Sequence, residues 1–320
     1  MNNPVLSICI PTYNRAYILD KSLQTLVCQD IFQKTNEVEI VISDNCSSDN
    51  TRSIVYKYIN KYGDKIKYSV NQKNVQDMNF PLALKLGKGK FLKLCNDTIL
   101  YSKTSLEDMI YIIKNNLDDM PILFFLNEKE KNTYSYNSLN EFIAKVSFMI
   151  TWSGSFGIWK DDVKYLKYME KFTNTRLCQS AVLLKMIDDK KNVKVITNHL
   201  FDLYKPSVKG NYNLAEVFIQ NYLQILKPFV SPDIYNSEKY RILAEHVLPR
   251  QFNLGVKYYY KKENFWNYTR DFHSDLKFYI LVLSVFLSKY AIGFRNNSKN
   301  IRLYLFGHKI LSFKRRKEIG

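Results

Sequence analysis

The chain has 320 residues, of which 46% are hydrophobic, so it is long enough to bury one large domain and a smaller second region. Its formal net charge is +17, and the excess is greatest near the carboxyl end, where residues 211–320 carry 18 Lys and Arg against 8 Asp and Glu. The five cysteines are scattered and form no Cys-x-x-Cys pair, which argues against a disulfide framework and a structural zinc site. The amino terminus has no basic leader, and we expect a cytoplasmic protein.

Short apolar runs rich in Val and Ile alternate with amphipathic stretches in the first part of the chain. The runs predicted to be strands are residues 5–10, 38–42, 66–70, 91–94 and 122–126. Between the first two runs, Leu19, Leu23 and Leu26 recur at helical spacing and predict a helix with one buried face. This alternation is typical of βα units, so we predict an α/β fold with a Rossmann-like, mostly parallel sheet flanked by helices.

Two turns in this region have sequence signals of their own. Gly87 and Gly89 bracket the entry into the fourth strand, where we expect glycine to permit a left-handed backbone. Ser105 and Asp108 resemble a capping box, which predicts a helix that begins just after the loop of that strand. Neither Gly-x-Gly-x-x-Gly nor Gly-x-x-x-x-Gly-Lys-Ser/Thr occurs, which disfavours a dinucleotide oxidoreductase or a P-loop NTPase.

The alternation ends near residue 212, where we place a domain boundary. Residues 1–212 are predicted to form the α/β domain, and residues 213–320 a basic, mainly helical region. Within the second region, residues 278–288 form an apolar run of 11 residues, shorter than the roughly 20 that a membrane span requires. Basic residues follow it closely, so we expect peripheral contact with an anionic inner membrane surface; a buried core helix explains the run equally well.

Three loops that follow predicted strands carry polar and aromatic residues suited to a nucleotide. In an open α/β sheet, ligands bind beyond the carboxyl ends of the strands. Tyr13 offers a face on which a base can stack, Asp44 a carboxylate that can contact the edge of the base, and Asp97 a ligand for a cation that bridges diphosphate oxygens. Taken alone each loop is weak evidence, since Asp and Asn are ordinary turn residues, but the placement of these residues after successive strands predicts a nucleotide diphosphate site.

The segment from residue 6 to residue 15, together with residues 39–45 and 47–51, resembles the opening of family 2 glycosyltransferases with the GT-A fold. The resemblance covers roughly the first 100 residues well and continues weakly to about residue 212. It implies that Tyr13 stacks on the base of the donor and that Asp44 contacts the same base. The full set of donor-binding residues that it implies is Pro11, Thr12, Tyr13, Arg15, Asp44, Asn74, Asn79, Asn96 and Lys209.

Residues 93–98 occupy the place of the metal motif of this family, an Asp-x-Asp-like cluster. Only the last carboxylate, Asp97, is present. The resemblance implies that Asp97 binds Mn²⁺ or Mg²⁺ together with phosphate oxygens and water, because these cations need few protein carboxylates when the substrate supplies oxygens. Asn96 contributes a neutral oxygen, so we expect weak affinity for free metal. A plain Asx turn between strand and helix is the alternative.

Residues 152–160 resemble the segment that forms the floor of the acceptor site in this family. The contacts that this resemblance implies come from Trp152, Ser153 and Gly154, although an indole also suits a protein core. Inverting members carry an acidic base at the start of the next helix, whereas residues 172–180 here contain no carboxylate. The catalytic base is therefore not identified. The nearest acids are Asp161, Asp162 and Glu170, for which helix capping is the simpler explanation.

The resemblance implies a metal-dependent glycosyltransferase of bacterial surface polysaccharide synthesis, such as capsule or lipopolysaccharide. Such an enzyme moves a sugar from a nucleotide-sugar donor to a glycan or lipid-linked acceptor. Two other hypotheses remain open. The missing base and Asn96 are compatible with a catalytically weakened subunit that only binds the nucleotide sugar. The charge and the 24 tyrosines suggest a basic nucleic-acid-binding protein, but no nucleic-acid motif accompanies them, so we expect no nucleic-acid partner.

Overall fold

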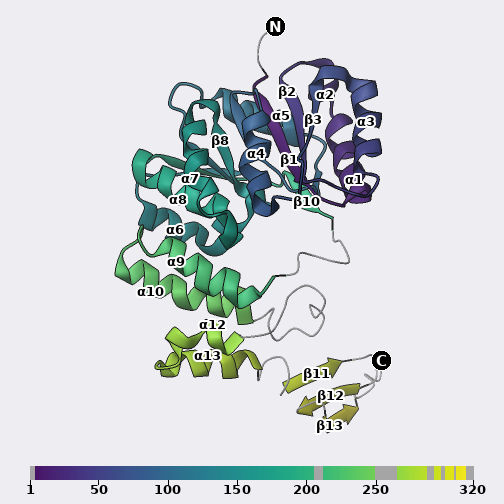
Figure 1. Ribbon diagram of the computed structural model, residues 1–320. Helices are drawn as coiled ribbons and strands as arrows, with labels where there is room; N and C mark the ends of the chain where they lie inside the picture. Colours follow the sequence, from purple (N-terminus) through teal and green to yellow (C-terminus); the bar gives the residue numbers. More distant parts are fainter. Residues whose placement is uncertain are drawn as a thin grey trace. The chain divides into compact units, whose positions relative to one another are not determined.

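The computed structural model describes residues 4–204, 212–248, 265–286, 292–296, 300–305 and 308–314 (Figure 1). The chain divides into two compact units. The first consists of Met1–Ser207 and Gln224–Tyr235, and the second of Val208–Leu223 and Asn236–Gly320. The boundary predicted at residue 212 lies close to the first of these divisions and stays a prediction.

A five-stranded sheet forms the centre of the first unit (Figure 1). Its strands, in spatial order, are β3 (Ile66–Val70), β2 (Val38–Asp44), β1 (Leu6–Thr12), β4 (Phe91–Leu94) and β8 (Gly157–Trp159). The first four are parallel, and β8 runs antiparallel to β4. The α/β fold with a mostly parallel sheet is thus confirmed, and so are the first four predicted strands.

Helices cover both faces of this sheet, and its central strands are therefore buried on both sides. Every residue of β1 and β2 is buried, as expected for continuous Val and Ile runs in a parallel sheet. On one face, Leu6, Ile8 and Ile10 join the main core with the buried side of α1 (Ala16–Val27). The other face is covered by α4 (Asn79–Leu86), which packs on β1 and β2. The sequence therefore leaves the two ends of the sheet, rather than its faces, open to ligands.

The remaining strands of the first unit lie outside the central sheet. β6 (Ile122–Leu126) was predicted as a further strand of that sheet, and this part of the prediction was wrong. β8 occupies the position beside β4, and β6 pairs instead with β9 (Val193–Thr197) in a second sheet that β7 (Asn132–Tyr136) completes. A two-stranded ribbon joins β5 (Ile99–Tyr101) to β10 (Phe201–Leu203).

The other helices of the first unit connect these strands. They are α2 (Asp30–Lys34), α3 (Thr51–Tyr62), α5 (Ser105–Lys114), α6 (Leu139–Val146), α7 (Leu166–Glu170) and α8 (Cys178–Lys190). The helix predicted after the loop of the fourth strand is α5, and its N-cap residue is Thr104.

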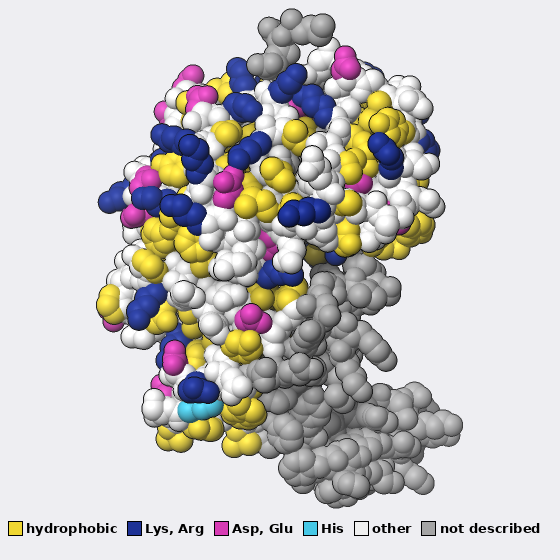
Figure 2. Space-filling view, in the orientation of Figure 1, with side chains coloured by type: hydrophobic (Ala, Val, Ile, Leu, Met, Phe, Trp, Pro, Cys, Tyr) yellow, Lys and Arg dark blue, Asp and Glu magenta, His cyan; other side chains and the backbone are white. Residues whose placement is uncertain are grey.

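The surface of the first unit carries many basic side chains. Lys164, Lys167, Lys171 and Lys185 lie close together on α7, α8 and the residues that flank α7, and Figure 2 shows Lys and Arg side chains over much of this unit. The positive charge is thus not confined to the carboxyl end.

The glycines before β4 are required for a reason other than the one predicted. Gly87 has a φ of −67°, which is not left-handed. The constraint is close approach, because a Cβ added to Gly89 would lie 2.7 Å from the backbone nitrogen of Ser7. The Gly89 amide also donates a hydrogen bond to the Ser7 hydroxyl, at 2.8 Å. These glycines let the turn pack directly against β1.

Residues 212–286 are mainly helical where the structure describes them. The helices are a π-helix at Glu216–Asn221, α9 (Tyr222–Leu226), α10 (Pro232–Arg241), a π-helix at Ile242–Val247, α12 (Phe265–Tyr268) and α13 (Leu276–Phe286). The described part of the chain has no helix that is long and apolar enough to cross a membrane.

The mainly helical prediction for residues 213–320 was too broad. β11 (Ile292–Asn296), β12 (Asn300–Leu305) and β13 (His308–Lys314) form an antiparallel sheet in that order. The signal was present in β12, where Ile301, Leu303 and Leu305 alternate with Arg302 and Tyr304 in the two-residue period of a strand. The abundance of basic residues concealed this alternation.

Candidate active site

The parallel strands bring the predicted donor loops to one edge of the sheet. Thr12, the last residue of β1, is the register partner of Asp44, the last residue of β2. The loop after β4 continues beside β1, where the Cys95 amide donates to the Cys9 carbonyl oxygen, at 2.9 Å. The carboxylates of Asp44 and Asp97 therefore both belong to loops at the carboxyl-terminal edge, as the sequence predicted.

Asp97 is a buried carboxylate that two side chains hold. Its Oδ2 accepts a hydrogen bond from the Thr12 hydroxyl, at 2.9 Å, and its Oδ1 pairs with the Arg15 guanidinium, also at 2.9 Å. The side chain is only 3% exposed. Burial raises the pKa of Asp97, while Arg15 and Thr12 oppose that rise by stabilising the ionised form. The first loop thus fixes the orientation of the carboxylate that follows β4.

Asp44 is also buried and held from two sides. Its Oδ1 accepts from the Ser47 amide, at 2.9 Å, and its Oδ2 accepts from the Tyr68 hydroxyl of β3, at 2.6 Å. Burial and this neighbouring carboxylate raise the pKa of Tyr68, which keeps the phenol protonated and donating. Tyr13 lies in the loop after β1 and is 43% exposed, so its ring is available to stack on a ligand.

Reciprocal hydrogen bonds join the loops after β1 and β2. The Asn14 amide donates to the Ser47 hydroxyl, at 2.8 Å, and the Ser48 amide donates to the Asn14 side-chain oxygen, also at 2.8 Å. The backbone of Asn14 is left-handed, with a φ of 50°. Asp49 accepts from the Ala16 amide, at 2.9 Å, which fixes the start of α1. Tyr13 is therefore held beside the Asp44 loop.

Asn74 and Asn79 of the third loop have structural contacts in this state. The Asn79 side chain is buried, accepts from the Ser43 hydroxyl at 2.6 Å and donates to the Ser43 carbonyl at 2.8 Å. The Asn74 Oδ1 accepts from the Asn45 side chain, at 2.9 Å. Both residues therefore position loops, and their direct contact with a donor stays a prediction.

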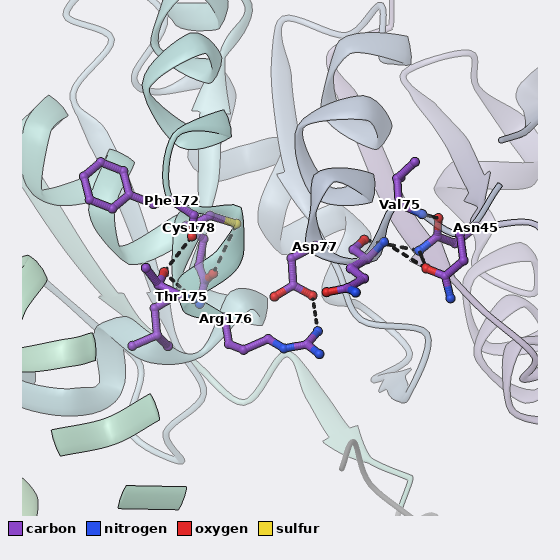
Figure 3. A network of polar contacts seen from close by, with 11 residues as sticks. Asn45, Val75, Asp77, Phe172, Thr175, Arg176 and Cys178 are labelled. Carbon is purple, nitrogen blue, oxygen red and sulfur yellow. Dashed lines mark hydrogen bonds and ion pairs between the residues drawn. The ribbon is translucent and has the colours of Figure 1, made fainter. Parts of the chain in front are cut away.

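Asn45 was not among the predicted site residues, yet it holds the third loop. Its Oδ1 accepts from the Val75 amide, at 2.8 Å, and its Nδ2 donates to the Gln76 carbonyl, at 3.2 Å (Figure 3). Gln76 has a left-handed φ of 52°, a conformation that such a clamp can stabilise. The signal was its place in the polar run after β2.

The predicted acceptor segment lies against the predicted metal loop. The Ser153 hydroxyl donates to the Asn96 side-chain oxygen, at 2.7 Å. The Trp152 ring packs on Phe201, with centroids 4.9 Å apart, and it lies so close to Gly154 that a Cβ there would meet it at 2.5 Å. Trp159, in contrast, is fully buried and donates its indole N–H to the Pro121 carbonyl. Of the two tryptophans, Trp159 is therefore core.

A buried lysine supports this segment from the sheet. Lys93 of β4 is 1% exposed and donates to the carbonyl oxygens of Gly154, Leu94 and Phe156. Burial lowers its pKa, and the three carbonyl acceptors compensate for the lost hydration. Its sequence signal was a single charge inside the apolar run Phe91–Leu94.

The three acids proposed as candidate bases lie at the opposite edge of the sheet. Trp159 pairs with Phe91, the first residue of β4, so the residues after β8 emerge at the amino-terminal edge. Asp161 is exposed there, Asp162 pairs with Lys190, and Glu170 pairs with Lys85 at the end of α4. The structure does not bring these acids to Asp97. Lys209 lies outside the described residues.

An acid from another loop faces the stretch in which the sequence shows no carboxylate. Asp77 pairs with Arg176, with Oδ1 and Nη1 2.9 Å apart (Figure 3). Sequence reasoning missed this contact because the two residues are 99 positions apart and nothing local connects them.

The fold is shared with glycosyltransferases of known structure. S. aureus TarS 1–349 in complex with UDP-GlcNAc aligns with a TM-score of 0.57 at 16% identity, over 97% of this chain and 99% of that chain. The mannosyltransferase PcManGT of Pyrobaculum calidifontis, solved with GDP-Man and Mn²⁺, aligns with a TM-score of 0.54 at 14% identity, over 89% of this chain and 80% of that chain. The architecture is therefore of the GT-A glycosyltransferase type.

The sequence profile described as Glycosyl transferase family 2 matches residues 7–183, more than half of the chain, and the chain belongs to this family. Abequosyltransferase RfbV of Salmonella typhimurium is 32% identical over 127 residues, 39% of this chain and 36% of the relative. Poly(ribitol-phosphate) beta-N-acetylglucosaminyltransferase TarS of Staphylococcus aureus is 32% identical over 117 residues, 37% of this chain and 20% of the relative. The matches thus span well under half of each relative's own length.

The paired Asp97 gives the first testable prediction, which concerns stability. Arg15→Met should lower the free energy of unfolding at pH 7 by about 1–3 kcal/mol, because a buried charge loses its partner. The lower part of this range is expected, since the Arg15 side chain is 36% exposed and water can replace part of the contact. Urea unfolding at several pH values measures the effect.

The sign of the pH dependence follows from the pKa of Asp97. Loss of Arg15 raises that pKa further, so the cost is greatest at a pH above the pKa of Asp97 in the folded variant, where the carboxyl is ionised in both folded proteins. Below the pKa of the unfolded carboxyl, Asp97 is protonated in both states and the cost disappears. Arg52→Met, at an exposed position of α3, is the control and should change stability by no more than about 0.5 kcal/mol. An equal cost at pH 7 and pH 3 would contradict this account.

Proposed function

We propose that the chain transfers a glycosyl group from a nucleotide-sugar donor to a glycan or lipid-linked acceptor in bacterial surface polysaccharide synthesis. The observation that carries the proposal is the convergence of Tyr13, Asp44 and Asp97 in loops of one sheet edge. Family membership supports the reaction class. The two relatives are named for transfer of abequose and for transfer of N-acetylglucosamine to poly(ribitol-phosphate), which supports a surface glycan as acceptor.

The base of the donor is assigned to the first two loops. The exposed ring of Tyr13 stacks on the base, and the oriented carboxylate of Asp44 accepts from its polar edge. The remaining donor contacts that we propose come from the rest of these loops and from the third loop. They are Pro11, Thr12, Arg15, Asn74, Asn79, Asn96 and, outside the described residues, Lys209.

The residues at Asp97 fit a divalent cation that arrives with the donor. The described residues contain no group of three or more His, Cys, Asp or Glu that could hold a metal by themselves. Asp97 supplies one oriented carboxylate and Asn96 one amide oxygen, and Mg²⁺ is commonly bound by one or two carboxylates plus substrate phosphates. The cation would supply charge neutralisation of the diphosphate leaving group. Mn²⁺ in the P. calidifontis complex supports this assignment.

The acceptor is assigned to the segment beside Asn96. Trp152 offers an indole face for a sugar ring, and Ser153 and Gly154 form the turn that packs against the metal loop.

We propose residues 1–212 as the catalytic domain and residues 213–320 as a basic accessory region. The proposed metal ligand Asp97 and the proposed acceptor residue Trp152 both lie in the first of the two compact units.

The metal assignment predicts the effect of Asp97→Asn on turnover. Release of nucleoside diphosphate from a panel of UDP-, GDP-, CDP- and dTDP-sugars, measured with Mn²⁺ or with EDTA, identifies the donor first. Asp97→Asn should then lower turnover at least about 100-fold, because it removes the single carboxylate that orients the cation. Asp162→Asn, at the other edge of the sheet, should stay within twofold of wild type. Unchanged turnover by Asp97→Asn, or full activity in EDTA, would reject the metal assignment.

The base site predicts losses of nucleotide affinity. Tyr13→Ala and Asp44→Asn should each weaken binding of the matching nucleoside diphosphate by about 1–3 kcal/mol, through lost stacking and a weaker hydrogen bond. Isothermal calorimetry measures these changes. Tyr17→Ala, at an exposed tyrosine of α1, is the matched control and should leave affinity unchanged. Equal affinities for wild type and both site variants would contradict the assignment of the base to Tyr13 and Asp44.

We also propose that the carboxyl-terminal region contacts an anionic membrane surface without crossing it. The apolar run at residues 278–288 begins in α13, whose Tyr279, Ile280 and Leu283 are 46%, 56% and 55% exposed. The basic residues that follow are Arg295, Lys299, Arg302, Lys309, Lys314, Arg315, Arg316 and Lys317, of which Lys299 and residues 315–317 lie outside the described residues. An exposed apolar face that is followed in sequence by many cations suits an anionic lipid surface.

Sedimentation with liposomes tests this membrane contact. The protein should pellet with anionic vesicles at low salt and be released at high salt, because each basic residue contributes about 1 kcal/mol that salt screens. Ile280→Ser combined with Leu283→Ser should abolish pelleting, whereas Tyr111→Ser, at a tyrosine of α5 that is 67% exposed, should not. Pelleting by the double variant equal to that of wild type would exclude α13 as the contact.

A further inference from the structure

The reaction needs a group that the assigned residues do not supply. A hydroxyl that attacks the anomeric carbon must lose its proton, and a positioned carboxylate is a common acceptor. The strand ends and loops that follow the four parallel strands carry four carboxylates, all within the described residues: Asp44, Asp49, Asp77 and Asp97.

Three of these carboxylates already have an assigned structural or metal-binding role. Asp44 accepts from Tyr68 and from the Ser47 amide. Asp49 accepts from the Ala16 amide and from the Thr51 hydroxyl, and these hydrogen bonds lower its pKa although burial opposes them. Asp97 is the proposed metal ligand. Asp77 is the carboxylate of this edge without an assigned role.

Asp77 faces the start of α8. It lies in a single 3-10 turn, Gln76–Met78, and its side chain is 15% exposed. Arg176, which pairs with it, has a left-handed φ of 65° and immediately precedes the residue that leads into α8 (Figure 3). The carboxylate is near enough to Cys178 to help burial raise the pKa of that thiol. Asp77 thus comes from another loop to a helix start that has no acid of its own.

The start of α8 is hydrogen-bonded to the residues that immediately precede the proposed acceptor segment. Gln179 donates to the Thr151 carbonyl, at 2.7 Å, and Ser180 donates to the Ile150 carbonyl, at 2.9 Å. From the other side, Ser153 donates to Asn96, beside Asp97. These hydrogen bonds, together with the short stretches of chain between them, link the partner of Asp77, the acceptor segment and the metal loop.

We infer that Asp77 is the general base of the proposed transfer and that Arg176 is its positioning residue; this inference rests on the proposed function. The acceptor oxygen forms a bond to the anomeric carbon as the bond from that carbon to the β-phosphate oxygen breaks. The bonding electron pair leaves with the nucleoside diphosphate. The proton of the acceptor hydroxyl passes to the Asp77 carboxylate. Burial raises the pKa of Asp77, and the Arg176 guanidinium opposes that rise by stabilising the ionised form.

The test compares three variants with the donor that wild type turns over in the nucleotide-sugar panel, using water as the acceptor. Asp77→Asn should lower turnover about 10²- to 10⁴-fold while affinity for the nucleoside diphosphate stays within twofold. Glu170→Gln, which removes a comparable ion pair with Lys85, should keep turnover within twofold of wild type. A wild-type protein that turns over no donor would overturn the proposed function itself. Wild-type activity retained by Asp77→Asn overturns only the role of Asp77.

A pH profile separates a base from a structural ion pair. Arg176 and Cys178 are the titratable groups beside Asp77 from the segments packed on it. Arg176→Gln removes the cation that lowers the pKa of Asp77, so the acidic limb of the rate profile should move to higher pH while turnover at high pH persists. A structural ion pair predicts instead equal losses in Asp77→Asn and Arg176→Gln, with an unshifted limb. If Asp77→Asn does not fold, the limb of Arg176→Gln decides alone.

Discussion

The parallel register of β1 with β2 and β4 is the constraint on which the candidate site depends. Parallel strands end at the same edge of the sheet, so strand direction alone brings together three loops that are far apart in sequence. Side-chain hydrogen bonds between these strands and loops then orient the carboxylates. Thr12 and Arg15 of the first loop hold Asp97 of the fourth, and Tyr68 of β3 holds Asp44 of β2. In each pair, one strand end orients the carboxylate of another.

The sequence predicted the sheet edge well because its signals are local. Continuous Val and Ile runs identify buried parallel strands, and the residue after each run is then a ligand candidate by topology. Tyr13, Asp44 and Asp97 follow from this rule. β6 was assigned to the wrong sheet because an apolar run specifies burial but not a neighbour. The glycines before β4 were identified correctly as structural, but for the wrong reason, since a close approach to Ser7 cannot be read from one segment.

Contacts between distant segments account for most of what sequence reasoning missed. Asn45 and Asn79 look alike as polar loop residues, yet one clamps a neighbouring loop and the other is buried against Ser43. The ion pair between Asp77 and Arg176 joins the third loop to the segment before α8, and no spacing rule connects them. Asp161, Asp162 and Glu170 illustrate the converse: proximity in sequence suggested them, while the antiparallel direction of β8 carries them to the other edge.

Lys93 has a consequence for how this site can diversify. The carbonyl oxygens of Gly154 and Phe156 are held by an amine that reaches them from β4, in addition to the contacts that Trp152 and Ser153 make within the turn. Part of what determines the backbone of this turn is thereby encoded outside the turn, at a single position of β4. If Trp152 contacts the acceptor, as proposed, its exchange can alter which glycan this segment accepts while Lys93 still holds the backbone beneath it. In that case acceptor preference can change at one partly exposed side chain without any change in the fold.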